Sequence, residues 1–361
     1  MKGKKVIVGM SGGIDSSVAA MLLVEQGYEV IGATLKIWGE GEYLDGEWHA
    51  RSCCKIGLAR YAAERLKIPY HVWDAHKEFQ EWVVDEFCRE YVNGRTPNPC
   101  IRCNERVKFS LLLEKAAALG ADGIATGHYA RTSFNPLDNK YVLKKGLDPE
   151  KDQSYFLYRL SQGQLSKIIF PLGEYTKAEV SVMAESLDLP VEEMQESQEV
   201  CFVTQEGYQE FIADQIPAAV NPGKFITSKG QALGEHKGIA FYTVGQRRGL
   251  RVAVGERLYV VSIDTRRNEI VLGKNEDLYS PGLIATDIHM VSGEPLKDTK
   301  YLQASIRYRN NASKAIVTPI GDGRFRVIFE KPQWAITPGQ SVVFYDADIV
   351  VGGGIIEGRI G

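Results

Sequence analysis

Residues 8–17 read Val8-Gly9-Met10-Ser11-Gly12-Gly13-Ile14-Asp15-Ser16-Ser17, with a short apolar run before them and a longer apolar, helix-forming run after them. Gly12 and Gly13 can adopt backbone angles closed to other residues, so main-chain amides there can approach a phosphate closely. Ser11, Ser16 and Ser17 add hydroxyl donors, and the N-terminus of the following helix adds a partial positive charge. The stretch therefore predicts a phosphate-binding loop. It is not a Walker A loop, because the G-x-x-x-x-G-K-[ST] spacing and its lysine are missing.

Strand and helix patterns alternate through the first third of the chain. Apolar runs predict strands at residues 6–9, 30–37, 70–73 and 124–126, and helical spacing predicts helices at 15–26, 55–66, 78–91 and 111–119. This order is typical of an α/β fold with a doubly wound parallel sheet, whose ligands bind at the carboxyl ends of the strands. Residues 154–187 are expected to be helical.

The pattern changes after residue 206, where short β-like runs are separated by glycines. We expect a catalytic α/β domain at residues 1–205, a small β-rich domain at 206–278 and a C-terminal antiparallel β-barrel at 279–361. The last of these rests on the alternation of apolar and polar residues in QASIRYR, FRVIFE and SVVFYD.

Composition limits the class of protein. A chain of 361 residues is long enough for two or three domains, and 44% hydrophobic with 25% charged residues is typical of a soluble globular protein. The net charge of −3 indicates no overall field for a polyanion, so a nucleic-acid surface would be a local patch. No stretch approaches the roughly 18 apolar residues needed to cross a bilayer. With no signal-peptide pattern at the start, we expect a cytoplasmic protein with no membrane partner.

Six cysteines are too few for a disulfide framework in a chain of this length. Cys100 and Cys103 form a C-x-x-C motif in a segment expected to be a proline-rich loop between helices. Alone, this motif fits a redox pair, half of a zinc site or cluster ligands. No second C-x-x-C is present, which argues against a four-cysteine zinc site. Cys88 is expected to pack in a core, and Cys53 and Cys54 are adjacent.

The S-G-G-x-D-S motif at residues 11–16 resembles the PP-loop, or ATP pyrophosphatase, superfamily. This resemblance implies cleavage of ATP between the α and β phosphates, with Mg²⁺ present. Further motifs make the chain similar to the tRNA-specific 2-thiouridylase family: R-T-P-N-P-x-x-x-C-N from Arg95, A-T-G-H-Y from Ala125, K-D-Q-S-Y-F-L from Lys151, S-x-x-x-C-F from Ser197, G-Q-R-x-G-L from Gly245, P-G-Q-S-V-V-F-Y from Pro338 and G-G-G-I-I from Gly352. The family converts the 2-carbonyl of the wobble uridine in tRNA to a thiocarbonyl.

The resemblance also implies site residues and partners. Asp15, Cys103 and Cys201 match catalytic positions. The matched ATP positions are Gly9, Met10, Ser11, Gly12, Gly13, Ile14, Asp15, Ser16, Leu35 and Gly127, and the matched tRNA positions are Asn98, Pro99, Cys100, His128, Lys151, Asp152, Gln153, Arg307, Tyr308 and Gln340. The implied partners are the anticodon stem-loop of tRNA and a sulfur-carrier or cysteine desulfurase protein.

Two sulfur carriers are compatible with these cysteines. In one, Cys201 bears a persulfide and Cys103 forms a disulfide with it when the sulfur is transferred. In the other, Cys100, Cys103 and Cys201 hold three irons of a 4Fe-4S cluster. The second arises because this chain has Cys100 where the family has an aspartate. A more distant alternative is another PP-loop nucleoside-modifying enzyme, which is disfavoured because such enzymes lack the C-terminal β modules and the Cys201 motif. Another is a non-catalytic RNA-binding protein, which the intact loop with Asp15 disfavours.

Overall fold

The computed structural model describes residues 3–37, 43–44, 47–48, 55–189, 200–203, 207–252 and 255–360. Cys53, Cys54 and the acidic stretch 192–199 lie outside these residues. Within the described part of the chain, no helix combines the length and apolar character that crossing a membrane requires.

A five-stranded parallel sheet forms the first layer of the N-terminal part, in the order β5-β2-β1-β6-β9. Its strands are β1 (Lys5–Gly9), β2 (Glu29–Lys36), β5 (Tyr70–Asp74), β6 (Gly123–Thr126) and β9 (Ile168–Ile169). Val6 and Val8 of β1 face one apolar cluster, which α1 (Ile14–Glu25), α2 (Ile56–Arg65) and α8 (Lys177–Glu185) complete. Ile7 faces a second cluster on the opposite side, with side chains from the helix that follows Pro99. Helices therefore cover both faces, and the predicted doubly wound sheet is confirmed.

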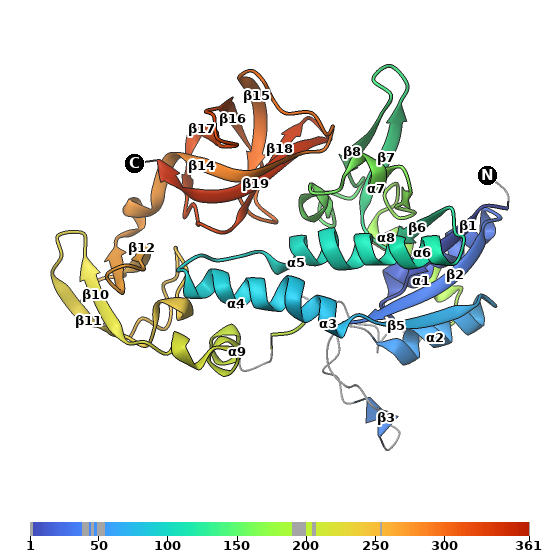
Figure 1. Ribbon diagram of the computed structural model, residues 1–361, viewed down its shortest axis with the longest axis horizontal. Helices are drawn as coiled ribbons and strands as arrows, with labels where there is room; N and C mark the ends of the chain where they lie inside the picture. Colours follow the sequence, from blue (N-terminus) through green and yellow to red (C-terminus); the bar gives the residue numbers. More distant parts are fainter. Residues whose placement is uncertain are drawn as a thin grey trace.

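Two long helical runs lie side by side and lead from the sheet toward the other domains (Figure 1). The first joins α3 (His76–Phe79), η1 (Gln80–Val84) and α4 (Asp85–Val92), and the second joins α5 (Pro99–Arg102), η2 (Cys103–Leu111) and α6 (Leu112–Ala118). The expected loop around Cys100 and Cys103 is wrong, because both residues are helical. Proline is favoured at a first helical position, where its missing N–H costs nothing, and Pro99 starts this helix. The segments η1 and η2 are π-helical, a geometry frequent at functional sites.

The expected helix over 154–187 is only partly present. The segment contains η3 (Ser154–Leu157), α7 (Gln162–Leu165) and α8, but β9 lies between them and pairs in parallel with β6. Two isoleucines pack better at a sheet edge than in a short helix, since β-branched side chains favour extended backbone. A hairpin of β7 (Ala130–Asn135) and β8 (Lys140–Lys145) precedes this segment, and β8 pairs with the barrel strand β19.

The middle part is a four-stranded sheet in the order β11-β10-β13-β12, formed by β10 (Gly223–Thr227), β11 (Ala232–His236), β12 (Tyr259–Asp264) and β13 (Glu269–Gly273). The helical segments beside it are α9 (Tyr208–Gln215), η5 (Pro217–Ala219), η6 (Ile239–Phe241) and η7 (Asn275–Leu278). Phe211, Phe225 and Val260 share one apolar cluster with Phe79 and Phe87 of the first helical run. The middle sheet is therefore packed onto the helix that leaves the parallel sheet.

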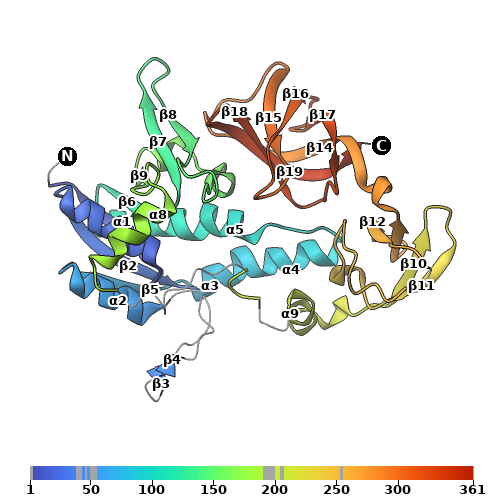
Figure 2. The same cartoon turned by 180° about the vertical axis from the view of Figure 1, so that it is seen from behind.

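The C-terminal part is a closed six-stranded antiparallel barrel, as predicted. Its strands follow the order β14-β17-β16-β15-β18-β19, and β14 pairs again with β19 to close the ring. They are β14 (Tyr279–Met290), β15 (Lys300–Ser305), β16 (Ser313–Pro319), β17 (Phe325–Trp334), β18 (Ser341–Asp346) and β19 (Ile349–Ile360). Alternate side chains such as Val317, Val327 and Val342 fill the interior. The barrel stands over the second helical run, beside the β7–β8 hairpin (Figure 2). A two-stranded piece, β3 (Tyr43–Leu44) with β4 (Glu47–Trp48), completes the described strands.

Candidate active site

The loop between β1 and α1 has the geometry of a phosphate cradle. Gly12 has a φ of +79°, and a Cβ there would lie 2.2 Å from the carbonyl oxygen of Lys55, so only glycine fits. Gly13 precedes α1, and no side chain caps that helix, which leaves its first turn for a ligand. Ser16 Oγ accepts a hydrogen bond from the amide of Ser11 at 3.2 Å and so holds the loop closed. The residues present fit the phosphates of a nucleotide.

Gly127 lies directly against this loop, at the end of β6. A Cβ on Gly127 would lie 2.7 Å from the carbonyl carbon of Asp15 and 2.7 Å from the amide nitrogen of Ser16. We expected this glycine to permit close approach of a nucleotide. In the structure, its close neighbour is the backbone of the phosphate loop itself.

Asp15 is held by two side chains from other elements. The hydroxyl of Tyr129 donates to its Oδ1 at 2.9 Å, and the ammonium of Lys177, at the start of α8, donates to the same oxygen at 2.6 Å. Both Asp15 and Lys177 keep about a quarter of their side-chain surface exposed, 23% and 25%. A cation beside the loop suits a polyphosphate, and sequence reasoning missed Lys177 because a lysine in a capped helix carries no motif of its own.

The other predicted ATP residues lie along the same edge of the sheet. Gly9 ends β1 and pairs with Thr126 at the end of β6. The carbonyl of Met10 accepts a hydrogen bond from the buried hydroxyl of Thr34. Leu35, near the end of β2, packs against the two clusters that flank this edge. The predicted ATP residues are thus brought together at the carboxyl ends of the strands.

The cysteines form a second group. Cys103 is buried in the apolar cluster of the helical runs, and Cys201 packs against that same cluster. Phe202 fixes the position of Cys201, since its ring makes edge contacts with Phe79 and Phe87 at centroid distances of 5.6 and 5.1 Å. Both Cys103 and Cys201 are thiols in the structure. The predicted packing role of Cys88 is confirmed, because it is 3% exposed and burial raises the pKa of its thiol to about 11.

Cys100 lies in α5, the first turn of the helix that carries Cys103, and the residue is exposed. Desolvation by neighbouring protein atoms raises the pKa of its thiol, while Lys108 acts to lower it and Cys201 to raise it further. In the described part of the chain, no group of three His, Cys, Asp or Glu side chains is arranged to hold a metal ion.

His128 joins the two groups of residues. It follows Gly127, its ring packs beside Phe109 at 5.5 Å, and its Nδ1 is 2.8 Å from the hydroxyl of Thr126. Burial lowers the pKa of His128 to about 3, and the charge of Lys108 contributes to this shift. The ring of His128 therefore links the end of β6 to η2, the segment that begins at Cys103.

Most of the residues predicted to contact tRNA make contacts within the chain. Asp152 accepts hydrogen bonds from the amides of Gly146 and Ser154, and Gln153 accepts one from the amide of Tyr129. Lys151 precedes these two residues in the chain, and its amide donates to the carbonyl of Asp148 at 3.2 Å. Asn98 is the N-cap of the helix that bears Cys100 and Cys103, and Pro99 is its first residue. Arg307, Tyr308 and Gln340 come from the barrel part of the chain.

The barrel residues reach back to the catalytic part. The amide of Gln340 donates to the carbonyls of Thr96 and Pro97 at 2.9 and 3.2 Å. The ring of Tyr308 packs against that of Phe156 in a tilted arrangement, with a centroid distance of 4.4 Å. Arg307 instead stays within the barrel, stacked over Trp334 at 5.2 Å.

The fold and the site together define a PP-loop protein of the ATP pyrophosphatase class, and that class implies the use of ATP. They combine a doubly wound parallel sheet, a glycine loop, an uncapped helix after that loop and an acid in the first turn of the helix. Family models match three successive parts of the chain: a tRNA methyl transferase HUP domain at residues 4–205, a tRNA methyl transferase PRC-barrel domain at 209–274 and an aminomethyltransferase beta-barrel domain at 280–356.

Three similar proteins share nearly the whole chain and carry the same name, tRNA-specific 2-thiouridylase MnmA. The protein from Acetivibrio thermocellus is 47% identical over 99% of this chain and 100% of its own length. One from Clostridium botulinum (strain Loch Maree) is 48% identical over 98% and 99%, and one from Caldanaerobacter subterraneus is 49% identical over 99% and 98%. The chain belongs to the tRNA-specific 2-thiouridylase family.

Proposed function

We propose that the protein is a tRNA-uridine 2-sulfurtransferase, which replaces the 2-oxygen of the wobble uridine by sulfur at the expense of ATP. One observation carries the proposal: the phosphate loop and the cysteines are joined through a short series of contacts. A Cβ on Gly127 would meet the backbone of Asp15, and the ring of His128, the next residue, packs at 5.5 Å beside Phe109 of η2. The segment η2 begins at Cys103, which shares one apolar cluster with Cys201. An ATP-activated carbonyl and a sulfur nucleophile can then meet in one site.

Activation is needed because a urea-type carbonyl is a poor electrophile and oxide a poor leaving group. The 2-oxygen attacks the α-phosphorus of ATP, pyrophosphate leaves, and the carbonyl carbon becomes open to a nucleophile. The amides of the loop and of the first turn of α1 hold the phosphates. Asp15 is suited to bind Mg²⁺, since a carboxylate is the hard oxygen ligand that this ion prefers.

Sulfur arrives on Cys201 as a persulfide. Its terminal sulfur adds to the activated carbon, and the thiolate of Cys103 attacks the inner sulfur of Cys201. A Cys103–Cys201 disulfide forms, the terminal sulfur stays on the uridine, and AMP leaves with the former 2-oxygen. Two equivalents of an external thiol then reduce the disulfide, and they leave as the oxidised external disulfide, which frees Cys103 and Cys201 for the next turnover.

A 4Fe-4S cluster on Cys100, Cys103 and Cys201 is the alternative carrier. Only this alternative needs Cys100, because a persulfide relay uses one carrier and one resolving thiol. Iron-free enzyme supplied with a persulfide donor and carrying Cys100→Ser should still thiolate tRNA. If activity instead requires about four irons per chain and is lost in Cys100→Ser, the relay is wrong.

The proposal also includes the domain boundaries, the partners and the cellular compartment. We propose domains at residues 1–205, 206–278 and 279–361, with the anticodon stem-loop held by the residues predicted above to contact tRNA. A sulfur-carrier or cysteine desulfurase protein would load Cys201, and the reaction would take place in the cytoplasm.

The test is Asp15→Asn. The variant should fold normally and should lose tRNA-dependent pyrophosphate release, because the amide cannot replace a carboxylate beside the phosphates and Mg²⁺. Asp122→Asn is the control: Asp122 immediately precedes β6, at the opposite end of that strand from Gly127, and accepts a hydrogen bond from the amide of Lys5. Mass analysis of the tRNA product separates 2-thiouridine from the methylated nucleoside that a methyl transferase would make. Full pyrophosphate release by Asp15→Asn, or a methylated product, would contradict the proposal.

A further inference from the structure

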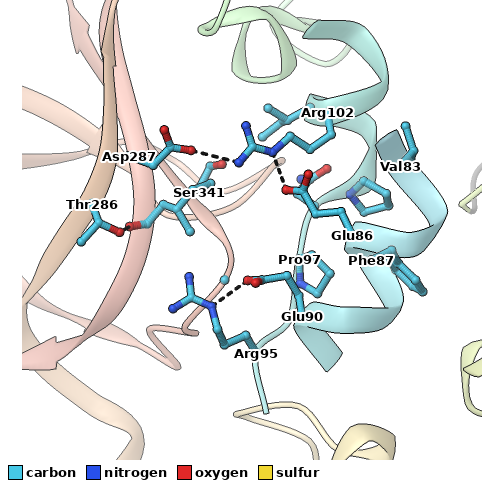
Figure 3. Close-up of a pocket in the computed structure, with 15 residues that line it drawn as sticks. Val83, Glu86, Phe87, Glu90, Arg95, Pro97, Arg102, Thr286, Asp287 and Ser341 are labelled. Atoms are coloured by element: carbon cyan, nitrogen blue, oxygen red, sulfur yellow. Dashed lines mark hydrogen bonds and ion pairs between the residues drawn. The ribbon is translucent and has the colours of Figure 1, made fainter. Parts of the chain in front are cut away.

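The barrel meets the cysteine-bearing helix through a half-buried group of charges. Arg102, the residue before Cys103, donates from Nε to Glu86 at 2.7 Å, from Nη1 to Glu105 at 2.9 Å and from Nη2 to Asp287 at 2.9 Å. Glu86 belongs to α4, the neighbouring helix, and Asp287 belongs to the barrel strand β14. Figure 3 shows Arg102 between these two carboxylates. The neighbouring helix, the cysteine-bearing helix and the barrel therefore each supply one carboxylate to the guanidinium group of Arg102.

A second arginine binds the same barrel carboxylate. Arg159 pairs with the same barrel residue, Asp287, at 3.1 Å and with Glu105 at 2.8 Å. The arginine side chains are only 17% and 11% exposed, whereas that of Asp287 is 46% exposed. Two poorly solvated guanidinium groups thus share one carboxylate from the barrel, and its loss would leave both with one acidic partner fewer.

The backbone at Asp287 is shaped for this contact. Asp287 has a φ of +48°, which is unusual for a non-glycine residue, and the pairing of β14 with β19 shifts its register between Thr286 and His289. Such a bulge bends the strand and redirects a side chain out of the regular pattern. Here the redirected side chain points from the barrel to Arg102 and Arg159.

The surroundings of Arg102 leave it room to move. A cavity of about 180 Å³ lies between α4, the 95–99 segment and the barrel, and Arg102, Glu86 and Asp287 are among the residues that line it. Without Asp287, the Arg102 guanidinium keeps Glu86 and Glu105, both on the helical runs, and loses its partner from the barrel. The turn of helix that carries Cys103 would then lose its fixed position relative to the barrel.

We propose that Asp287 is a positioning residue for sulfur transfer: through Arg102 it sets the orientation of the helical turn that presents Cys103, so the thiol is correctly placed only when the barrel is docked. The inference rests on the proposed role of Cys103. ATP activation does not depend on it, because the contacts of the phosphate loop and of Asp15 described above involve no residue of this charged group.

The barrel offers a matched control. Asp348 pairs with Arg131 of the β7 strand at 3.0 Å, with side-chain exposures of 44% and 24%, close to the 46% and 17% of Asp287 and Arg102. It too is a barrel aspartate bound to an arginine of the catalytic part, but its partner is not on the cysteine helix. Asp287→Asn and Asp348→Asn thus each remove one half-exposed barrel carboxylate that binds an arginine of the N-terminal part, one on the cysteine helix and one away from it.

The experiment uses three assays on the full chain: tRNA-dependent pyrophosphate release, thiolation kinetics that give kcat and KM, and the alkylation rate of Cys103 by iodoacetamide, measured by peptide mapping. Asp287→Asn should lower the thiolation kcat by about tenfold to a hundredfold, the usual result of a misplacement near 1 Å. KM for tRNA and pyrophosphate release should stay unchanged, and Cys103 should alkylate at an altered rate. Asp348→Asn should match the parent protein throughout, and Asp287→Glu, which keeps the charge, should restore part of kcat.

A parallel loss of pyrophosphate release and thiolation in Asp287→Asn would overturn the proposal, because it would indicate general loss of docking. Equal effects of Asp287→Asn and Asp348→Asn would also overturn the proposal. Thiolation and alkylation rates in Asp287→Asn that match those of the parent protein would overturn it as well. If Asp287→Asn does not fold, Asp287→Glu with its melting temperature measured takes its place, and altered Cys103 alkylation is then the supporting result. If the parent protein makes no thiouridine, the proposed function fails, while the alkylation rates still decide whether Asp287 positions Cys103.

Discussion

Gly127→Ala should disable ATP cleavage while leaving the protein folded. The added methyl group would meet the backbone of Asp15 and Ser16 at 2.7 Å, the point where the phosphate loop enters α1. Backbone atoms on both sides cannot rotate away as a flexible side chain would. The loop and the end of β6 must therefore separate.

The size of this displacement follows from the contact distance. Ordinary van der Waals contacts of a Cβ begin near 3.4 Å, so atoms at 2.7 Å must move apart by about 0.7 Å. Overpacking of this kind costs about 1–3 kcal/mol of stability. A shift approaching 1 Å at a site that must align two reacting groups can reduce the rate by about a hundredfold. Function should thus suffer much more than folding.

The assay compares pyrophosphate release at saturating ATP and tRNA with unfolding in urea. Gly163→Ala serves as the control, because the same methyl group is added inside α7 with no heavy atom closer than 4.0 Å. Gly163→Ala should keep full activity and should be at least as stable as the parent, since alanine favours helix over glycine. Gly127→Ala with more than half of the parental activity would refute the argument that this glycine sets the position of the loop.

Three further predictions concern stability. Burial holds the pKa of His128 near 3, whereas a histidine of the unfolded chain has a pKa near 6.5, so the free energy of unfolding should fall as the pH drops below 6.5, by about 2 kcal/mol at pH 5. Urea unfolding of His128→Gln at the same pH values should show a smaller loss. Equal pH slopes in both proteins would contradict this. Phe79→Ala, which removes a fully buried ring beside Phe202, should cost about 3–5 kcal/mol in urea unfolding, and a cost below 1 kcal/mol would show that the cluster is loosely packed. Gln340→Ala removes two hydrogen bonds to loop carbonyls and should cost about 1–3 kcal/mol and speed proteolysis of that loop, whereas unchanged cleavage would argue against the loop being held by the barrel.

Local patterns predicted the parallel sheet and the barrel, because buried strands and alternating strands carry their signal in neighbouring residues. They failed where distant residues decide the structure. The prolines and the C-x-x-C motif predict a loop at Cys100 and Cys103, but the segment that starts at Pro99 is a helix. Its buried face packs against side chains from more than one part of the fold, which local sequence does not show. The sequence pattern over 154–187 predicts helix at β9, and only the pairing of β9 with β6 makes it a strand.

The candidate site shows the same division. Glycines and serines of the phosphate loop could be identified because the chemistry of phosphate binding is written in consecutive residues. Lys177 and Asp287 could not, since one is a helix lysine 162 residues from its partner and the other a strand aspartate 185 residues from Arg102. Their roles arise only when separate elements meet, and no local pattern distinguishes them from surface charges.

The contact between the 95–99 loop and the barrel also sets an order of events during protein synthesis. The amide of Thr96 donates to the carbonyl of Pro338, and Gln340 donates back to the carbonyl of Thr96, 244 residues earlier in the chain. At roughly 5–20 residues per second, a ribosome needs about 12–50 s to reach Gln340 after Thr96. During that interval the loop before Pro99 has no barrel to close against. The cysteine helix of a nascent chain therefore gains its final support only when the last domain has left the ribosome.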